Sequence, residues 1–167
     1  LDFTGGEPFM IQEHFQLLEK FVKSDYAKNV TLHYNTNGTQ LPLEAMNILF
    51  PKFKEVDVHF SIDGVGKHYE YQRHPAKWDR AVEIIQAFKD KQSKKFTVGI
   101  CHTINIFNVM YIPEFLEWAN DFTSMNDFEI TKTEGVSGMI RKKDWDYIGG
   151  NDDRFAPAYW EDADLFI

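Results

Sequence analysis

Apolar and polar positions alternate along the chain with two different periods. A spacing of two residues predicts strands, and a spacing of three or four residues predicts amphipathic helices. The shorter period occurs in residues 1–4, 30–35, 56–63 and 96–104, and again near 128–133. The longer period occurs between them, with its apolar positions at Ile11, Phe15, Leu18 and Val22, at Leu43, Met46, Phe50 and Phe53, at Trp78, Val82, Ile85 and Phe88, and at Ile112, Phe115, Leu116 and Ala119.

The resulting order, βαβαβαβαβ, predicts an α/β fold with parallel strands. Every predicted strand also keeps a polar or small face, formed by Asp2 and Thr4, His33 and Asn35, Asp57, His59 and Ser61, Cys101, Thr103 and Asn105, and Glu129, Thr131 and Thr133. Strands of a doubly wound sheet are apolar on both faces, so this pattern argues against that fold. We expect a partial (β/α) barrel with its helices on the convex side and a polar interior. The alternative is a two-layer sheet whose polar face lies in water.

Composition restricts the possible partners. The chain has 167 residues and a formal net charge of −8, which argues against binding to nucleic acid or to an anionic membrane surface. No apolar run reaches the roughly 20 residues that span a bilayer. Cys101 is the only cysteine, so an internal disulfide is excluded and a reducing, cytoplasmic setting is favoured.

The pattern also suggests where this domain lies. The chain opens with Leu1 and begins at once with a strand pattern, so we expect a truncated N-terminus. After residue 134 the periodicity fades into a glycine-containing stretch. We therefore assign residues 1–134 to one core domain and residues 135–167 to a linker or the start of a C-terminal region.

The first candidate ligand-binding motif is Thr4-Gly5-Gly6-Glu7-Pro8, between a predicted strand and a predicted helix. Two glycines allow the backbone to approach a ligand closely, and proline initiates the helix. Backbone carbonyls and the Glu7 carboxylate suit a ligand ammonium better than a phosphate. A plain turn between strand and helix is the alternative.

Two further motifs follow later strands. Asn35-Thr36-Asn37-Gly38-Thr39 has ordinary turn chemistry. In Ser61-Ile62-Asp63-Gly64, Ser61 and Asp63 share one strand face, so a hydroxyl and a carboxylate can hold a vicinal diol such as a ribose. The guanidinium of Arg73 can bind a carboxylate in bidentate form. The alternative places Asp63 in a turn and Arg73 in solvent.

Together these motifs resemble the radical S-adenosylmethionine (SAM) superfamily, particularly peptide-modifying members with SPASM or twitch auxiliary-cluster domains. Residues 1–134 would correspond to the second to sixth strands of that family's core. The resemblance implies that Gly5, Gly6, Glu7 and Pro8 lie at the SAM amino group. It implies that Ser61 and Asp63 bind the ribose and Arg73 the carboxylate. Asn37 and Asn105, at neighbouring strand ends, complete the expected cofactor-binding set.

One part of the family pattern is missing from this sequence. Three thiolates of a Cys-x3-Cys-x2-Cys loop hold the catalytic [4Fe–4S] cluster in the family, and this chain has only Cys101. We expect the cluster cysteines upstream of Leu1 and no metal ligand within the chain. The 167 residues alone should then neither hold a cluster nor cleave SAM.

In the intact enzyme, the resemblance implies an electron donor, reductive cleavage of SAM to a 5′-deoxyadenosyl radical, and hydrogen abstraction from a substrate. A peptide or protein substrate is indicated. Candidate substrate contacts are His33, Asp57, His59 and Glu129, each of which has a structural role as its alternative. Three other readings remain: a non-catalytic module binding an adenosyl or amino-acid ligand or a partner, a degenerate homologue without a cluster, and a barrel enzyme that uses Asp57 and Asp63 as paired carboxylates.

Overall fold

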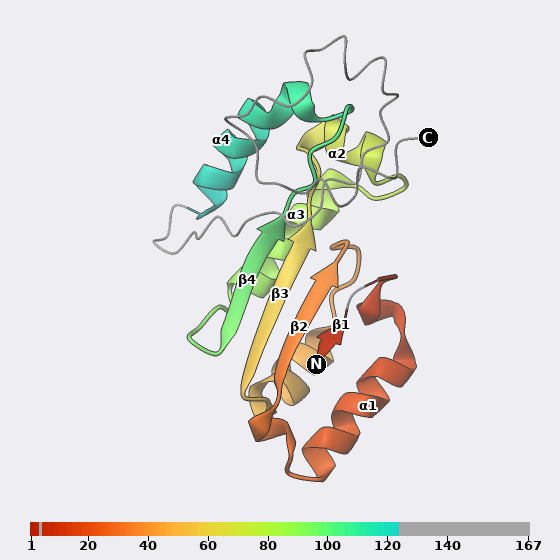
Figure 1. The fold of residues 1–167 in the computed structure, drawn as a ribbon, viewed down its shortest axis with the longest axis vertical. Coiled ribbons are helices and arrows are strands. Elements are labelled where there is room, and N and C mark those ends of the chain that lie inside the picture. Colours follow the sequence, from red (N-terminus) through yellow and green to blue (C-terminus); the bar gives the residue numbers. More distant parts are fainter. Residues whose placement is uncertain (4, 124–167) are drawn as a thin grey trace, which may run out of the picture.

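The structure is a computed structural model that describes residues 1–3 and 5–123 of the chain. Within these residues a single parallel sheet contains β1 (Asp2–Phe3), β2 (Thr31–Thr36), β3 (Glu55–Ser61) and β4 (Phe96–Cys101) (Figure 1). Their order in the sheet is their order along the chain. The predicted α/β fold with parallel strands is confirmed. The strand predicted near 128–133 and the region 135–167 lie outside the described residues.

Helical segments connect the strands, as parallel neighbours require. The α-helices are α1 (Gln12–Lys23), α2 (Gly66–Gln72), α3 (Trp78–Lys89) and α4 (Ile112–Thr123). Shorter turns of helix are η1 (Pro8–Met10), η2 (Ala27–Asn29), the π-helix η3 (Ala45–Leu49), η4 (Phe50–Lys52) and η5 (Val109–Tyr111). Figure 1 shows α2 and α4 beyond the ends at which the strand arrows point. Among the described residues, no helix is both long enough and apolar enough to cross a membrane.

The alternation of side chains gives the sheet one buried face. On that face Leu32, Tyr34, Val58 and Phe60 have no exposed area. The helical segments pack against it through aromatic rings: Phe88 of α3 lies 5.2 Å from Phe60, and Phe9 of η1 lies 4.9 Å from Tyr34, between ring centroids. The other face carries the predicted polar positions of β2 and β3, His33 and Asn35, and Asp57, His59 and Ser61, whose side chains are partly exposed. The period of two therefore assigned both faces correctly.

The helix predicted from Leu43, Met46, Phe50 and Phe53 is wrong in form. The segment begins as the π-helix η3 and continues as the 3-10 helix η4, which contains Pro51. Proline has no N–H to donate to a preceding turn, so a regular α-helix cannot continue through it. Three of the four apolar positions are still buried, but Leu43 is 52% exposed.

Three smaller expectations also need correction. Ile11 precedes α1 and is exposed, while the buried positions of that helix are His14 and Leu18. Leu116 of α4 is exposed, although Phe115 and Ala119 are buried as predicted. The strand predicted over 96–104 ends at Cys101, whose lateral partner Ser61 is the last residue of β3, so no strand continues beside residues 102–104.

Candidate functional site

The turn after β1 is joined to the turn after β2 by the carboxylate of Glu7. This side chain is buried, and its oxygens accept from the Thr36 hydroxyl at 2.8 and 3.0 Å and from the Asn37 N–H at 2.8 Å. Its Oε1 also accepts from the Phe9 N–H at 3.3 Å, which caps η1. The first two motifs, about 30 residues apart, thus lie in contact. Glu7 performs a structural task that its position in sequence did not predict.

The glycines before Glu7 leave the backbone of this turn open. Gly5 and Gly6 are exposed, with φ angles of 82° and 64°. A Cβ added at either residue would have no other atom within 4 Å. Positive φ favours glycine. Pro8 is buried at the start of η1. Because Glu7 is engaged inside the chain, the exposed backbone of Gly5 and Gly6 is the part of this motif best placed to meet a ligand.

Asn37 organises the second motif. Its Oδ1 accepts from the Thr39 N–H at 2.9 Å and from the Thr39 hydroxyl at 2.6 Å, an Asx turn of the kind expected for this sequence. The hydroxyl of Tyr69 in α2 donates to the Asn37 carbonyl at 3.2 Å. The Asn37 side chain is therefore used within its own turn, and the turn is fastened to α2.

The third motif contains an ion pair within the chain. Oδ2 of Asp63 accepts from Nε of Arg73 at 2.7 Å and lies 2.5 Å from its Nη2, and Oδ1 accepts from the Thr103 N–H at 3.1 Å. The structure thus brings Asp63 and Arg73 together at the strand ends, as a shared ligand site requires. The two side chains form an ion pair with each other. The Ser61 side chain is half-buried on the polar face, and Ser61 pairs laterally with Cys101 of β4.

Asn108 is a structural residue that the sequence analysis missed. It is 1% exposed, and its Nδ2 donates to the carbonyls of Asp63 at 2.9 Å and Thr103 at 2.7 Å. Its Oδ1 accepts from the N–H of Asn105 at 2.7 Å, while Nδ2 of Asn105 donates to Gln72 at 2.9 Å. The Asn-x-x-Asn spacing was the available signal. This network fastens the ends of β3 and β4 to α2.

Cys101 is a free, half-buried thiol. Burial first, and the negative charge of Asp63 second, raise its pKa above the ordinary value. A cluster ligand must be a thiolate. A single thiol cannot supply the three thiolates that such a cluster needs.

A second cluster of polar side chains lies within β2 and β3, away from their carboxyl ends. His33 Nδ1 lies 2.8 Å and His59 Nε2 lies 3.3 Å from Oδ2 of Asp57. Hydrogen bonds from His59 and Thr97, with the charge of His59, hold the pKa of Asp57 far below its ordinary value even though burial acts in the opposite direction. The hydrogen bond and charge of Asp57 raise the pKa of His59. We call His33, Asp57 and His59 the His–Asp–His cluster. Glu129, the fourth candidate substrate contact, lies outside the described residues.

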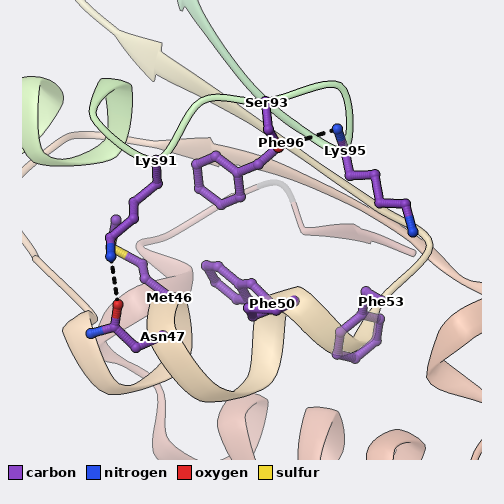
Figure 2. A pocket seen from close by; sticks show the side chains of 9 residues that line it. Met46, Asn47, Phe50, Phe53, Lys91, Ser93, Lys95 and Phe96 are labelled. Carbon is purple, nitrogen blue, oxygen red and sulfur yellow. Dashed lines mark hydrogen bonds between the residues drawn. The ribbon is translucent and has the colours of Figure 1, made fainter.

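A cavity lies elsewhere, away from the strand-end motifs. Its volume is about 300 Å³, and it is lined by residues from 46–53 and 91–96. Figure 2 shows Phe50, Phe53 and Phe96 around it. Nζ of Lys91 donates to Oδ1 of Asn47 at 2.8 Å across one side. This cavity lies where β3 and β4 begin, whereas ligands of βα folds bind at the opposite ends of the strands. We therefore place the candidate site at the carboxyl ends.

No known family model, curated protein or solved structure matches this chain.

Proposed function

We propose that this chain is the SAM-binding core of a radical SAM enzyme, with its strands forming part of an open (β/α) barrel. One observation carries the proposal. Three strand-end motifs, far apart in sequence, lie at the carboxyl edge of one parallel sheet. Glu7 of the first accepts hydrogen bonds from Thr36 and Asn37 of the second, and Tyr69 of α2, the helix that follows the third, donates to the Asn37 carbonyl. Ligands of βα folds bind at this edge.

The groups at this edge fit the parts of SAM. The exposed backbone of Gly5 and Gly6 presents polar atoms to the ammonium, with Glu7 and Pro8 holding the turn. The Ser61 hydroxyl and the Asp63 carboxylate suit the ribose diol. Arg73 uses Nε and Nη2 on Asp63, and a guanidinium has five N–H donors, so donors remain for the ligand carboxylate. Asn37 and Asn105 then act by holding the surrounding turns. When bound, SAM would supply the radical precursor.

The [4Fe–4S] cluster does not fit the residues of this chain, because Cys101 is the only thiol. The proposal therefore puts the three cluster cysteines upstream of Leu1, and it assigns no chemical step to them here. It includes an external electron donor, a cytoplasmic location and a peptide or protein substrate on the polar face of the sheet. The observation behind that last element is the partly exposed row of polar side chains along β2 and β3.

A non-catalytic module that binds an adenosyl or amino-acid ligand is the second candidate. It is favoured by the single thiol and by the internal engagement of Glu7 and Asp63. The residues preceding Leu1 in the parent gene distinguish the two. Three cysteines at the Cys-x3-Cys-x2-Cys spacing support the enzyme, whereas a full-length protein without them supports the module.

The site itself is tested by SAM binding to the intact protein, measured by isothermal titration calorimetry. Arg73→Ala should weaken binding roughly tenfold or more, since a charge-assisted hydrogen bond contributes about 1.5–3 kcal/mol. Ser61→Ala combined with Asp63→Asn should do the same. Lys28→Ala, at an exposed residue paired with Asp25, is the control and should leave binding unchanged. Unchanged affinity in both folded test variants would refute the assignment.

A further inference from the structure

The His–Asp–His cluster lies on two neighbouring strands, β2 and β3, and belongs to none of the strand-end motifs. His33 is the lateral partner of Asp57, and His59 follows Asp57 by two positions on the same face of β3. The potential ligand atoms of all three side chains lie within 4.8 Å of one another. Register and pleat, which are backbone properties, therefore produce the convergence of these groups.

We propose that His33, Asp57 and His59 form a binding site for a divalent transition-metal ion of the zinc class. Two imidazole nitrogens and one carboxylate oxygen are a donor set that suits such ions, and three protein ligands leave a position for water or substrate. The proposal depends neither on SAM nor on an iron–sulfur cluster. It differs from the expectation that the chain contains no metal ligand.

The distances from Asp57 to the two histidines are close to those that a metal requires, and the two histidine nitrogens lie within 4.8 Å of each other. Bonds of 2.0–2.1 Å in tetrahedral geometry separate ligand atoms by about 3.3 Å. The separation between His59 Nε2 and Asp57 Oδ2 is already 3.3 Å, and that between His33 Nδ1 and Asp57 Oδ2 is 2.8 Å. The second pair must open by about half an ångström, which small side-chain rotations supply. An ion would then replace the hydrogen bonds that now join these groups.

The surroundings orient the cluster as an outer shell orients metal ligands. The Thr97 hydroxyl donates to Oδ1 of Asp57 at 2.7 Å, which leaves Oδ2 directed at the two histidines. Gly99, the lateral partner of His59, makes room for its ring: a Cβ there would lie 2.9 Å from Cδ2 and 3.1 Å from Nε2. Partners of this kind fix ligand orientation and raise affinity.

The cluster is accessible from one side. The side chains of His33, Asp57 and His59 are 32%, 31% and 27% exposed, on the face of the sheet opposite the aromatic core. Half-burial limits competition from water, while the exposed fraction provides an entry path and an open coordination position. His59 is two residues before Ser61 on the same face, so the ion would lie about 7 Å below the proposed ribose contact.

The test is titration of the purified protein with Co²⁺, followed by visible d–d absorption, and with Zn²⁺ in competition. We expect one ion per chain. His59→Gln and His33→Gln should each weaken binding by more than about 100-fold, since loss of an outer-shell partner alone costs about 10–100-fold. Gly99→Ala, which contributes no ligand, should weaken it about tenfold by displacing the His59 ring. His74→Gln removes an exposed histidine outside the cluster and should change nothing.

Folding of every variant is checked by circular dichroism. A second measurement needs only the parent protein: Zn²⁺ should shift the imidazole resonances of His33 and His59 and leave those of the other four histidines in place. Absence of stoichiometric binding to the parent would overturn the proposal. So would unchanged affinity in folded His59→Gln, or Zn²⁺ shifts confined to other histidines.

Discussion

Replacement of Glu7 by alanine tests how the ends of β1 and β2 are held together. Glu7 is 8% exposed and accepts hydrogen bonds from the Phe9 N–H, the Thr36 hydroxyl and the Asn37 N–H. A hydrogen bond to a charged group contributes about 1.5–3 kcal/mol, and a buried group that loses its partner costs about 1–3 kcal/mol. The contact to Phe9 is long, at 3.3 Å, and Asn37 is partly exposed, so water recovers some of the loss.

We therefore expect Glu7→Ala to lower the free energy of unfolding by about 3–5 kcal/mol, a large part of the 5–15 kcal/mol typical of a domain. Glu7→Gln keeps one acceptor oxygen and should lose about half as much. The measurement is urea denaturation followed by tryptophan fluorescence, to which Trp78 and Trp118 of the described fold contribute. Glu19→Ala, at an exposed residue paired with Lys23, is the control and should change stability by less than about 0.5 kcal/mol.

A loss below about 1 kcal/mol for Glu7→Ala, with an unchanged denaturant slope, would refute this account of Glu7. That result would show that the two turns hold their geometry without the carboxylate. The Glu7 carboxylate would then be available to bind a ligand.

Two other predictions concern a buried titratable group and a glycine. Burial of His14 lowers its pKa from 6.5 to about 4, so the folded state resists protonation; stability should be full above pH 6.5 and fall by up to about 3 kcal/mol as the pH drops to 4. Urea denaturation between pH 4 and 7.5 measures this, and a slope that persists in His14→Gln would contradict it. Gly38 has φ 72°, and a Cβ there would lie 3.1 Å from the Phe60 ring, so Gly38→Ala should cost about 2 kcal/mol or more. Gly5→Ala, also at positive φ but in open space, should cost only about 1 kcal/mol, and equal losses at the two positions would be evidence against the steric contact.

Local pattern predicted the elements and faces of this sheet well. Alternation at Val56, Val58 and Phe60 identified one face of β3 as buried, and the structure confirms it. Such alternation depends only on the pleat of a strand, which needs no knowledge of distant residues. Prediction failed where the helical spacing of apolar residues coincided with a proline. At η3 and η4 the helical spacing was correct, but Pro51 interrupts the hydrogen bonds that a regular helix needs.

The sequence by itself determined the parallel α/β order, the buried and polar strand faces, and the position of each turn motif after a strand. Only the tertiary structure decided which groups meet. Pairing of β2 with β3 places His33 beside Asp57, and packing of the strand-end turns places the Glu7 carboxylate on Thr36. These contacts join residues 24 and 29 positions apart. Strand register and turn packing set them, and both follow from the whole core rather than from any local stretch of sequence.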